Sequence, residues 1–330
     1  MNQAASKHVQ PRPPLFTRQF RAVAFLTGAV VAAAPTFAAE TGVGFYLLGS
    51  KGPGAGIVPP PGVYVQNDLY FYSGSADADR QFPVGGEIIA GIDANAQINL
   101  TSALWSTPWQ VLGGNVAFTA TLPFGAQDVS ASAFIPGIGL GRAVDDDLFT
   151  LGDPVAGAMI GWHSGNLHWN VGTLINVPIG NYQEGEIANL SFNHWGVDIS
   201  GAATWLDPTT GLDISGAAGF TFNAENPETD YRTGTEFHAE WAISKAVSQD
   251  LSLGIIGYYY KQISGDSGDG ARLGDFKGQV AAIGGTVGYN FMAGSTPVSL
   301  RAKIYREFSA RNRLEGTAGY LTVSVPLNIR

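Results

Sequence analysis

Cysteine is absent from the 330-residue chain, and charged residues make up only 14% of it. Without cysteine, disulfide bonds, thiol catalysis and cysteine-ligated metals are excluded. Bases are the scarcer charge, with 18 Lys and Arg against 27 Asp and Glu, and four of the bases precede residue 39. The rest of the chain therefore has a net charge of 14 minus 27, or −13. It lacks the clustered Lys and Arg that a nucleic-acid partner requires.

Long apolar runs are also missing. After residue 38 there is no apolar run of 18 residues, so the sequence predicts no membrane-spanning helix in that part. Yet 45% of the chain is hydrophobic and 44 residues are glycine. A strand-rich chain with so little charge either buries two sheet faces against each other, as a β-sandwich does, or exposes one face to lipid, as a membrane barrel does.

The N-terminal region divides into two segments. Lys7, Arg12, Arg18 and Arg21 precede an uncharged apolar stretch at residues 22–34, and residues 36–38 (Thr-Phe-Ala) supply small residues for cleavage, so we expect a signal peptide at 1–38. Residues 39–62 are rich in glycine and proline, and proline donates no hydrogen bond to a sheet. We expect this second segment to be either a periplasmic tail or a plug in the lumen of a barrel that occupies residues 63–330.

Residues 87–101 show a period of two. Every even position from Ile88 to Leu100 is apolar, whereas most odd positions are polar. Because successive strand side chains point to opposite faces, this pattern indicates a strand with one apolar and one polar face. In a membrane barrel the even residues are expected to face lipid. The odd residues predicted to line the lumen are Glu87, Asp93, Asn95, Gln97 and Asn99.

Similar alternation predicts twelve antiparallel strands in an up-and-down barrel, with both termini on the periplasmic side. Short turns alternate with longer segments, as in bacterial outer-membrane barrels, and the longest gap, at 123–153, is expected to be a large external loop. The expected strands are 63–72, 87–100, 110–122, 154–163, 166–178, 192–206, 211–223, 234–246, 251–263, 276–291, 297–308 and 316–329.

Inward positions on two further strands carry titratable groups. Glu236, His238 and Glu240 share one face of a strand, and His194 and Asp198 share a face of another. These residues predict either a cation or proton-linked selectivity element, or simply the polar lining of a water-filled lumen. Partners for the acids are expected from across the lumen, from Arg301 or Lys303.

Aromatic residues gather near strand ends, where barrels carry interfacial girdles. The run Tyr258, Tyr259 and Tyr260 is a candidate contact for an apolar solute. The acidic loops around Asp145 and Asp266 lack the spacing of a calcium loop, and no catalytic motif is evident, so the sequence predicts no metal, no cofactor and no enzyme. A hydrophilic porin, an outer-membrane hydrolase and a secreted β-sandwich binding protein are the alternatives.

Five local patterns together resemble the outer-membrane channel family "MetA-pathway of phenol degradation". They are residues 59–64 (PPPGVY), 152–154 (GDP), 177–182 (VPIGNY), Asn226 with 229–231 (TDY), and 260–262 (YKQ) with 264–268 (SGDSG). The resemblance spans roughly residue 40 to the end. It implies a barrel in the bacterial outer membrane for passive uptake of small hydrophobic or aromatic compounds, with the bilayer and lipopolysaccharide as its surroundings.

Overall fold

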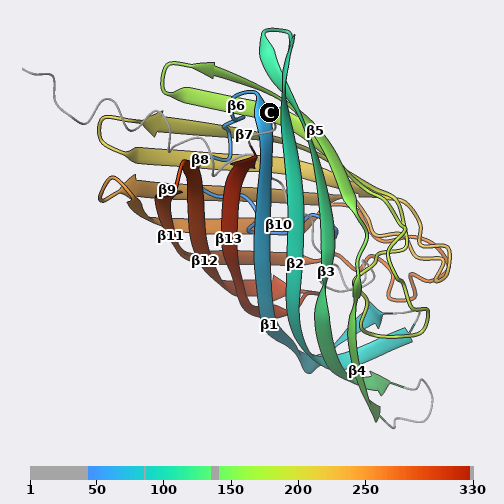
Figure 1. Cartoon of the computed structure of the whole chain (residues 1–330). Helices are drawn as coiled ribbons and strands as arrows, with labels where there is room; N and C mark the ends of the chain where they lie inside the picture. Colours follow the sequence, from blue (N-terminus) through green and yellow to red (C-terminus); the bar gives the residue numbers. More distant parts are fainter. Residues whose placement is uncertain (1–43, 85–86, 135–140, 328–330) are drawn as a thin grey trace, which may run out of the picture.

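One antiparallel sheet accounts for nearly all of the described chain (Figure 1). The computed structural model describes residues 44–84, 87–134 and 141–327, so the predicted signal peptide lies outside the described residues. The strands are β1 (Gly62–Val84), β2 (Glu87–Val111), β3 (Gly114–Phe134), β4 (Gly141–Leu151), β5 (Val155–Ser164), β6 (Leu167–Asn176), β7 (Gly196–Asp207), β8 (Leu212–Asn223), β9 (Glu236–Ala246), β10 (Leu251–Gln262), β11 (Gln279–Ala293), β12 (Thr296–Arg311) and β13 (Glu315–Leu327).

The sheet closes on itself. β1 pairs with β13 on one side and with β2 on the other, and β3 pairs with β2 on one side and with β4 and β5 on the other. β5 pairs with residues 115–121 of β3, and β4 pairs with residues 124–134 of the same strand. β4 and β5 therefore occupy one strand position of the barrel, one after the other. Within the described residues the barrel therefore has twelve strand positions, which confirms the predicted all-β, twelve-strand architecture.

The connections mark the two ends of the barrel. Tight turns at residues 112–113, 165–166 and 294–295 lie at one end, and the longer segments 177–195, 224–235 and 263–278 lie at the other. Short turns are periplasmic in outer-membrane barrels. β1 begins at the short-turn end, where Val63 pairs with Leu327 near the end of β13. The first strand therefore begins, and the last strand ends, at the short-turn end.

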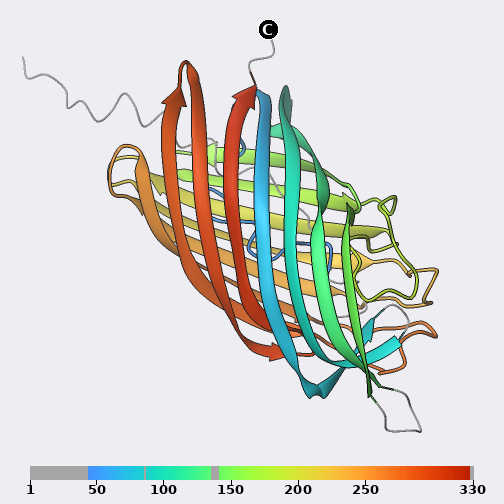
Figure 2. The same cartoon turned by 60° about the horizontal axis from the view of Figure 1, so that its bottom comes forward.

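The prediction of an external loop at 123–153 is wrong, because most of these residues form strands. β1, β2 and β3 are 23, 25 and 21 residues long, and with β4 they project past the outer ends of the other strands (Figures 1 and 2). Pro123 suggests a strand end because it cannot donate to a ladder. It lies between the stretches of β3 that pair with β5 and with β4, where the ladder on that side is already interrupted.

An apolar band encircles the outer surface. Exposed apolar side chains occupy alternate positions, as a lipid-facing surface requires. Tryptophans gather at the periplasmic end, where Trp105 and Trp109 lie edge to face at 5.2 Å between ring centroids, and Trp162 and Trp169 stack at 6.2 Å. No helix in the described part of the chain is long and apolar enough to cross a membrane. Members of the band include Phe118, Val171, Ile199, Ile214, Ile243, Ile255, Ile283, Ile304 and Leu321.

The band predicts where a charge is tolerated. Val171 is 52% exposed and lies midway along β6, so Val171→Arg should cost roughly 2–4 kcal/mol of folding free energy in the bilayer. Asn95→Arg is the matched control, since Asn95 is exposed on the outer extension of β2. Heat-modifiability gels of protein refolded into liposomes should show a reduced folded fraction for the Val171 variant alone. Equal losses for both variants would contradict this position of the lipid band.

Candidate functional site in the barrel lumen

Residues 44–61, here called the N-terminal segment, lie inside the ring of strands (Figures 1 and 2). Inward side chains of β12 and β13 bind its backbone. The Lys303 ammonium donates to the carbonyl oxygens of Gly49, Ser50 (2.8 Å) and Lys51 (3.2 Å). The hydroxyls of Tyr305 and Tyr320 donate to the carbonyls of Gly49 and Leu48. The side of the segment facing β12 and β13 is thus supplied with donors by the wall.

β9 and β7 hold the opposite side of the segment. The ring of Tyr46 stacks on His238 with 3.5 Å between ring centroids, and its hydroxyl donates to Glu240 at 2.7 Å. Glu240 also accepts from the backbone nitrogen of Lys51 at 3.1 Å. His238 in turn contacts Asp198 at 2.7 Å between Nε2 and Oδ2. A wall carboxylate and a wall histidine are therefore occupied by the segment.

The lower part of the segment lies directly against β6, β7 and β8. The backbone nitrogens of Gly54 and Gly56 donate to Ser215 (3.0 Å) and Thr204 (2.8 Å), and Asn170 donates to the carbonyl of Ala55 (2.9 Å). A Cβ atom at Gly56 would lie 2.5 Å from the backbone nitrogen of Thr204. Only glycine permits so close an approach of the two backbones.

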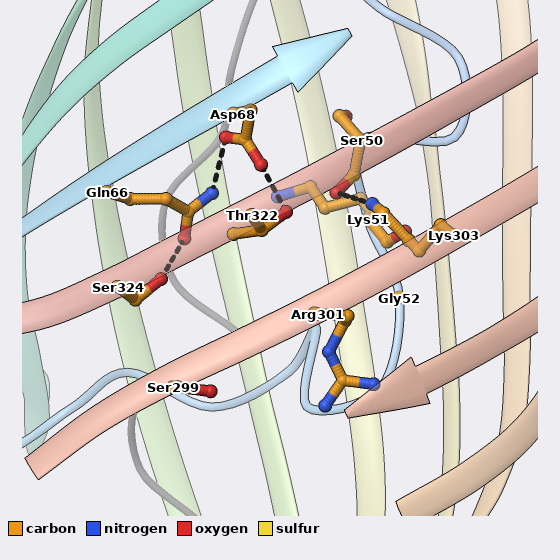
Figure 3. Close-up of a pocket in the computed structure, with 10 residues that line it drawn as sticks. All are labelled: Ser50, Lys51, Gly52, Gln66, Asp68, Ser299, Arg301, Lys303, Thr322 and Ser324. Atoms are coloured by element: carbon orange, nitrogen blue, oxygen red, sulfur yellow. Dashed lines mark hydrogen bonds between the residues drawn. The ribbon is translucent and has the colours of Figure 1, made fainter. Parts of the chain in front are cut away.

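Little space remains beneath the segment. A polar cavity there has a volume of about 20 Å³ and is lined by Lys51, Arg301, Lys303 and neighbouring polar residues (Figure 3). On its wall Asp68 accepts from Gln66 and Thr322, and Ser324 donates to Gln66 (Figure 3). A volume of this size holds about one water molecule. The segment and the wall therefore fill this part of the lumen.

Tyrosines gather on the inner surface beside the segment. We call Tyr70, Tyr72, Tyr258, Tyr260, Tyr305 and Tyr320 the tyrosine layer; each is at most 8% exposed. Ring centroids lie 5.0 Å apart for Tyr70 and Tyr320 and for Tyr258 and Tyr305. The carboxylate of Glu307 accepts from Tyr72 and Tyr258 at 2.8 Å each, and that of Glu236 accepts from Tyr260 at 2.6 Å. The layer thus combines apolar ring faces with buried carboxylates.

The outer half of the interior contains an apolar cluster. Buried side chains of β2, among them Ile92, Ile98 and Leu100, belong to one cluster with Leu190 and Phe192 of the loop at 177–195. Asp153, at the break between β4 and β5, fixes this loop. Its carboxylate accepts from Ser191 (2.6 Å), Phe192 (2.8 Å), Gly180 (2.9 Å) and Asn176 (3.0 Å). One buried carboxylate therefore holds both ends of the loop.

The local patterns that resemble the channel family meet in the outer loops. Asp153 of the pattern at 152–154 accepts from Gly180 of the pattern at 177–182, Asn226 donates to the hydroxyl of Tyr182 at 3.2 Å, and Tyr231 donates to Asp266. Burial raises the pKa of Asp266, although its hydrogen bonds oppose that shift. The patterns thus join loops that are distant in sequence.

The lumen assignment on β2 is wrong. Asp93, Asn95 and Gln97 are exposed, and Asn99 faces outward, where it bonds with Asn67 at 2.8 and 3.0 Å. The apolar residues expected to face lipid are instead buried: Ile98, for example, pairs with the inward Tyr70. This part of β2 extends beyond the lipid band, so water contacts its outer face and loops pack against its inner face. The side chain of Glu87 is not among those described.

Most of the other predicted site residues lie inside the barrel, and two do not lie where they were expected. Glu236, His238, Glu240 and Asp198 are buried inside the barrel, and Tyr258 and Tyr260 belong to the tyrosine layer. Tyr259 faces outward, with its ring 6.5 Å from that of Phe237, because neighbouring strand positions alternate. His194 is buried in the loop before β7 rather than on a strand, and its Nδ1 lies 3.1 Å from the carbonyl of Trp195.

Several residues that face the lumen were not predicted from the sequence. Tyr70, Glu307 and Tyr320 could have been found from the inward phase of their strands, since Tyr70 alternates with outward Leu69 and Phe71. Tyr46 carries no such signal, because the segment around it has no period. Lys303 was expected to pair with an acid, but it binds backbone carbonyls instead.

A closed barrel with a lipid-facing band and a filled lumen defines an outer-membrane β-barrel. The chain belongs to the family described as "Putative MetA-pathway of phenol degradation", whose model matches residues 78–323, and this confirms the resemblance seen in the sequence. No curated protein sequence matches the chain.

Solved structures of other outer-membrane proteins are similar to the chain, and the first of them shares its fold. The COG4313 outer membrane channel from Pseudomonas putida F1 is similar at a TM-score of 0.65 and 17% identity, covering 83% of this chain and 99% of that one. A Pseudomonas aeruginosa FadL homologue is similar at a TM-score of 0.43 and 10% identity, covering 91% and 100% of the two chains. The CymD monoaromatic hydrocarbon channel has a TM-score of 0.41 and 6% identity, with coverage of 81% and 89%.

Asp153 allows a test of the outer-loop arrangement. Asp153→Ala leaves buried donors of Gly180, Phe192 and Asn176 without their acceptor, so we expect it to destabilise the loop at 177–195 by at least about 2 kcal/mol. Limited proteolysis of the folded protein should cut this loop faster. Asp147→Ala, which removes an exposed carboxylate of β4, is the control. Unchanged cleavage in Asp153→Ala would show that Asp153 does not hold the loop.

Proposed function

We propose that this protein is a passive outer-membrane channel for small hydrophobic or aromatic compounds, and that residues 44–61 act as a plug. The observation that carries the proposal is that the interior holds an apolar cluster toward its outer end, whereas the wall hydrogen-bonds a chain segment inside the rest of the lumen. The free energy of an apolar solute falls when it leaves water for the apolar cluster in the outer half of the interior. A hydrated solute meets a lumen with about 20 Å³ of free polar space in the cavity under the segment.

The wall groups take defined roles in this proposal. Glu240, His238 and Lys303 hold the plug, with Asp198 orienting His238. Tyr258 and Tyr260 offer ring faces to an aromatic solute at the boundary between the two halves, where Glu307 and Glu236 hold their hydroxyls. Aromatic rings in offset or edge-to-face contact attract one another by about 0.5–1.5 kcal/mol beyond burial of area. The phenol-degradation description of the family supports this solute class.

The rival functions are less well supported. A hydrophilic porin needs an open polar bore, which the hydrogen-bonded segment occupies. For a hydrolase, His238 and Asp198 are paired, but the hydroxyl beside them, Thr221, donates to Asp198 rather than contacting the histidine. We therefore propose a channel without catalytic activity, in contact with the bilayer and with lipopolysaccharide.

The plug can be loosened at a single glycine. Gly56→Val would place a side chain against the Thr204 backbone, so the segment should leave its site and raise single-channel conductance in planar bilayers several-fold or more. Gly52→Ala is the control, because a Cβ there has its nearest contact at 3.7 Å, with the end of Lys303. Wild-type conductance in a folded Gly56→Val protein would count against the plug.

Solute class is tested separately. Liposomes containing the wild-type protein should take up toluene or phenol faster than protein-free liposomes, and should not swell in isotonic sugar. We expect Tyr258→Ala to reduce aromatic uptake without changing sugar exclusion, because ring contacts are lost while Glu307 keeps its hydrogen bond from Tyr72 and the plug contacts are untouched. Large steady conductance together with free sugar uptake by the wild-type protein would favour the porin instead.

A further inference from the structure

An apolar groove lies on the lipid-facing surface of β10–β13. It has a volume of about 510 Å³, and its lining includes Leu253, Val287, Ala302, Ile304, Gly319 and Leu321. Three glycines line the hollow, and the outward side of two of them, Gly285 and Gly319, is open. A Cβ atom would find its nearest neighbour at 3.5 Å at Gly319 and at 3.8 Å at Gly285, which are ordinary contacts. Packing within the barrel therefore does not require glycine at either position, and the hollow is available to a molecule outside the wall.

Basic side chains lie on the same strands, toward their outer ends. Lys261 of β10 and Arg306 and Arg311 of β12 are exposed. Arg306 stands two residues beyond Ile304 of the groove, or about 7 Å along the strand. It donates to Thr317 at 3.3 Å, in the first row that carries polar outward groups. Lys261 and Arg311 both align with Gln279 on β11, which lies between them.

The opposite outer wall has the opposite charge. Asp128 of β3 pairs with Asp147 of β4, and Asp145 pairs with Ser130 beside Asp93, so two neighbouring rows carry exposed carboxylates. An anionic lipid is therefore repelled from the β2–β4 wall and attracted to the β10–β12 wall. The groove and the basic residues coincide on one side of a barrel that is acidic as a whole.

We infer that Lys261, Arg306 and Arg311, with the groove below them, form a site for one molecule of lipid A, the phosphorylated and acylated glycolipid of the outer leaflet. Arginine and lysine bind phosphate through charge-assisted hydrogen bonds, and an acyl chain fills an apolar hollow. The outer-membrane placement puts phosphate groups at the height of the basic residues. The inference gives the lipopolysaccharide contact of the proposed function a location, and it is independent of which solute passes through the lumen.

Binding of purified lipid A to the delipidated protein in detergent, followed by native mass spectrometry, tests the charged half of the site. Each basic residue near a lipid headgroup contributes about a fivefold change in affinity, so the triple variant Lys261→Gln, Arg306→Gln, Arg311→Gln should bind about 100-fold more weakly. Lys245→Gln, which removes an exposed base at the periplasmic end of β9, should bind within about twofold of wild type.

The groove is tested by filling it. Gly319→Leu should weaken lipid A binding, whereas Gly201→Leu should not, since Gly201 is an outward glycine on β7 with comparable space for a Cβ atom. Should Gly319→Leu fail to fold on a heat-modifiability gel, Gly319→Ala and the charge variants still decide the matter. The charge and groove readouts need no transport, so a failed solute assay leaves them unaffected.

Competing probes identify the ligand chemistry. Dephosphorylated lipid A should bind at least tenfold more weakly than lipid A, and millimolar inorganic phosphate should not displace lipid A. Displacement by inorganic phosphate alone would reduce the site to a simple anion site and overturn the inference. Equal affinity of the triple variant and the wild type, or equal affinity of the phosphorylated and dephosphorylated lipids, would overturn it as well.

Discussion

Every backbone polar group that crosses a lipid bilayer must find its partner within the protein, and this constraint shapes the whole barrel. The ladder closes because β1 pairs with β13 and because β3, where its pairing with β4 ends, continues to pair with β5. At the break Gly152-Asp153-Pro154 the backbone groups still find partners, since the nitrogen of Gly152 donates to the carbonyl of Pro123 and the carbonyl of Pro154 accepts from Val177, both at 3.0 Å. Closure of the sheet and satisfaction of the break are thus solutions to the same energetic problem.

The same requirement explains why the lumen holds a chain segment rather than a bore. The N-terminal segment is too rich in glycine and proline to form a strand, so its amide and carbonyl groups need partners from the wall. Lys303, Tyr305, Tyr320, Ser215, Thr204 and Asn170 provide them. Wall groups that would otherwise line water thereby bind the segment, and the cavity between the segment and β12 has a volume of only about 20 Å³. Buried carboxylates on this wall accept hydrogen bonds from hydroxyls, as at Glu307 and Glu236.

The side chains on the outer surface of the barrel differ in polarity along the barrel axis and in charge around it. Its lower part is apolar and carries the tryptophan girdle, whereas its outer extension on β1–β4 carries exposed Asp93, Asp128 and Asp147. Basic groups concentrate on β10 and β12. Since the three strands β1–β3 extend past the others, loops pack against their inner face and make the apolar outer half of the interior. Strand length, rather than any single residue, therefore positions the candidate solute path above the plug.

Local sequence alone determined the number of strands and the position of most of them, because alternation and turn composition are properties of neighbouring residues. It missed the outer parts of β1 and β3 and the whole of β4. It also placed Glu236, His238 and Glu240 on one inward face, since a strand alternates regularly. Local sequence did not determine which face of residues 92–100 meets the interior. An apolar face suits lipid and a packed core equally well. The structure decides between them, since the apolar side chains of this stretch are buried. Nor did local sequence locate Tyr46 or the plug. Those positions depend on contacts across the lumen, between residues such as Leu48 and Tyr320 that are 272 positions apart, and only the closed barrel brings them together.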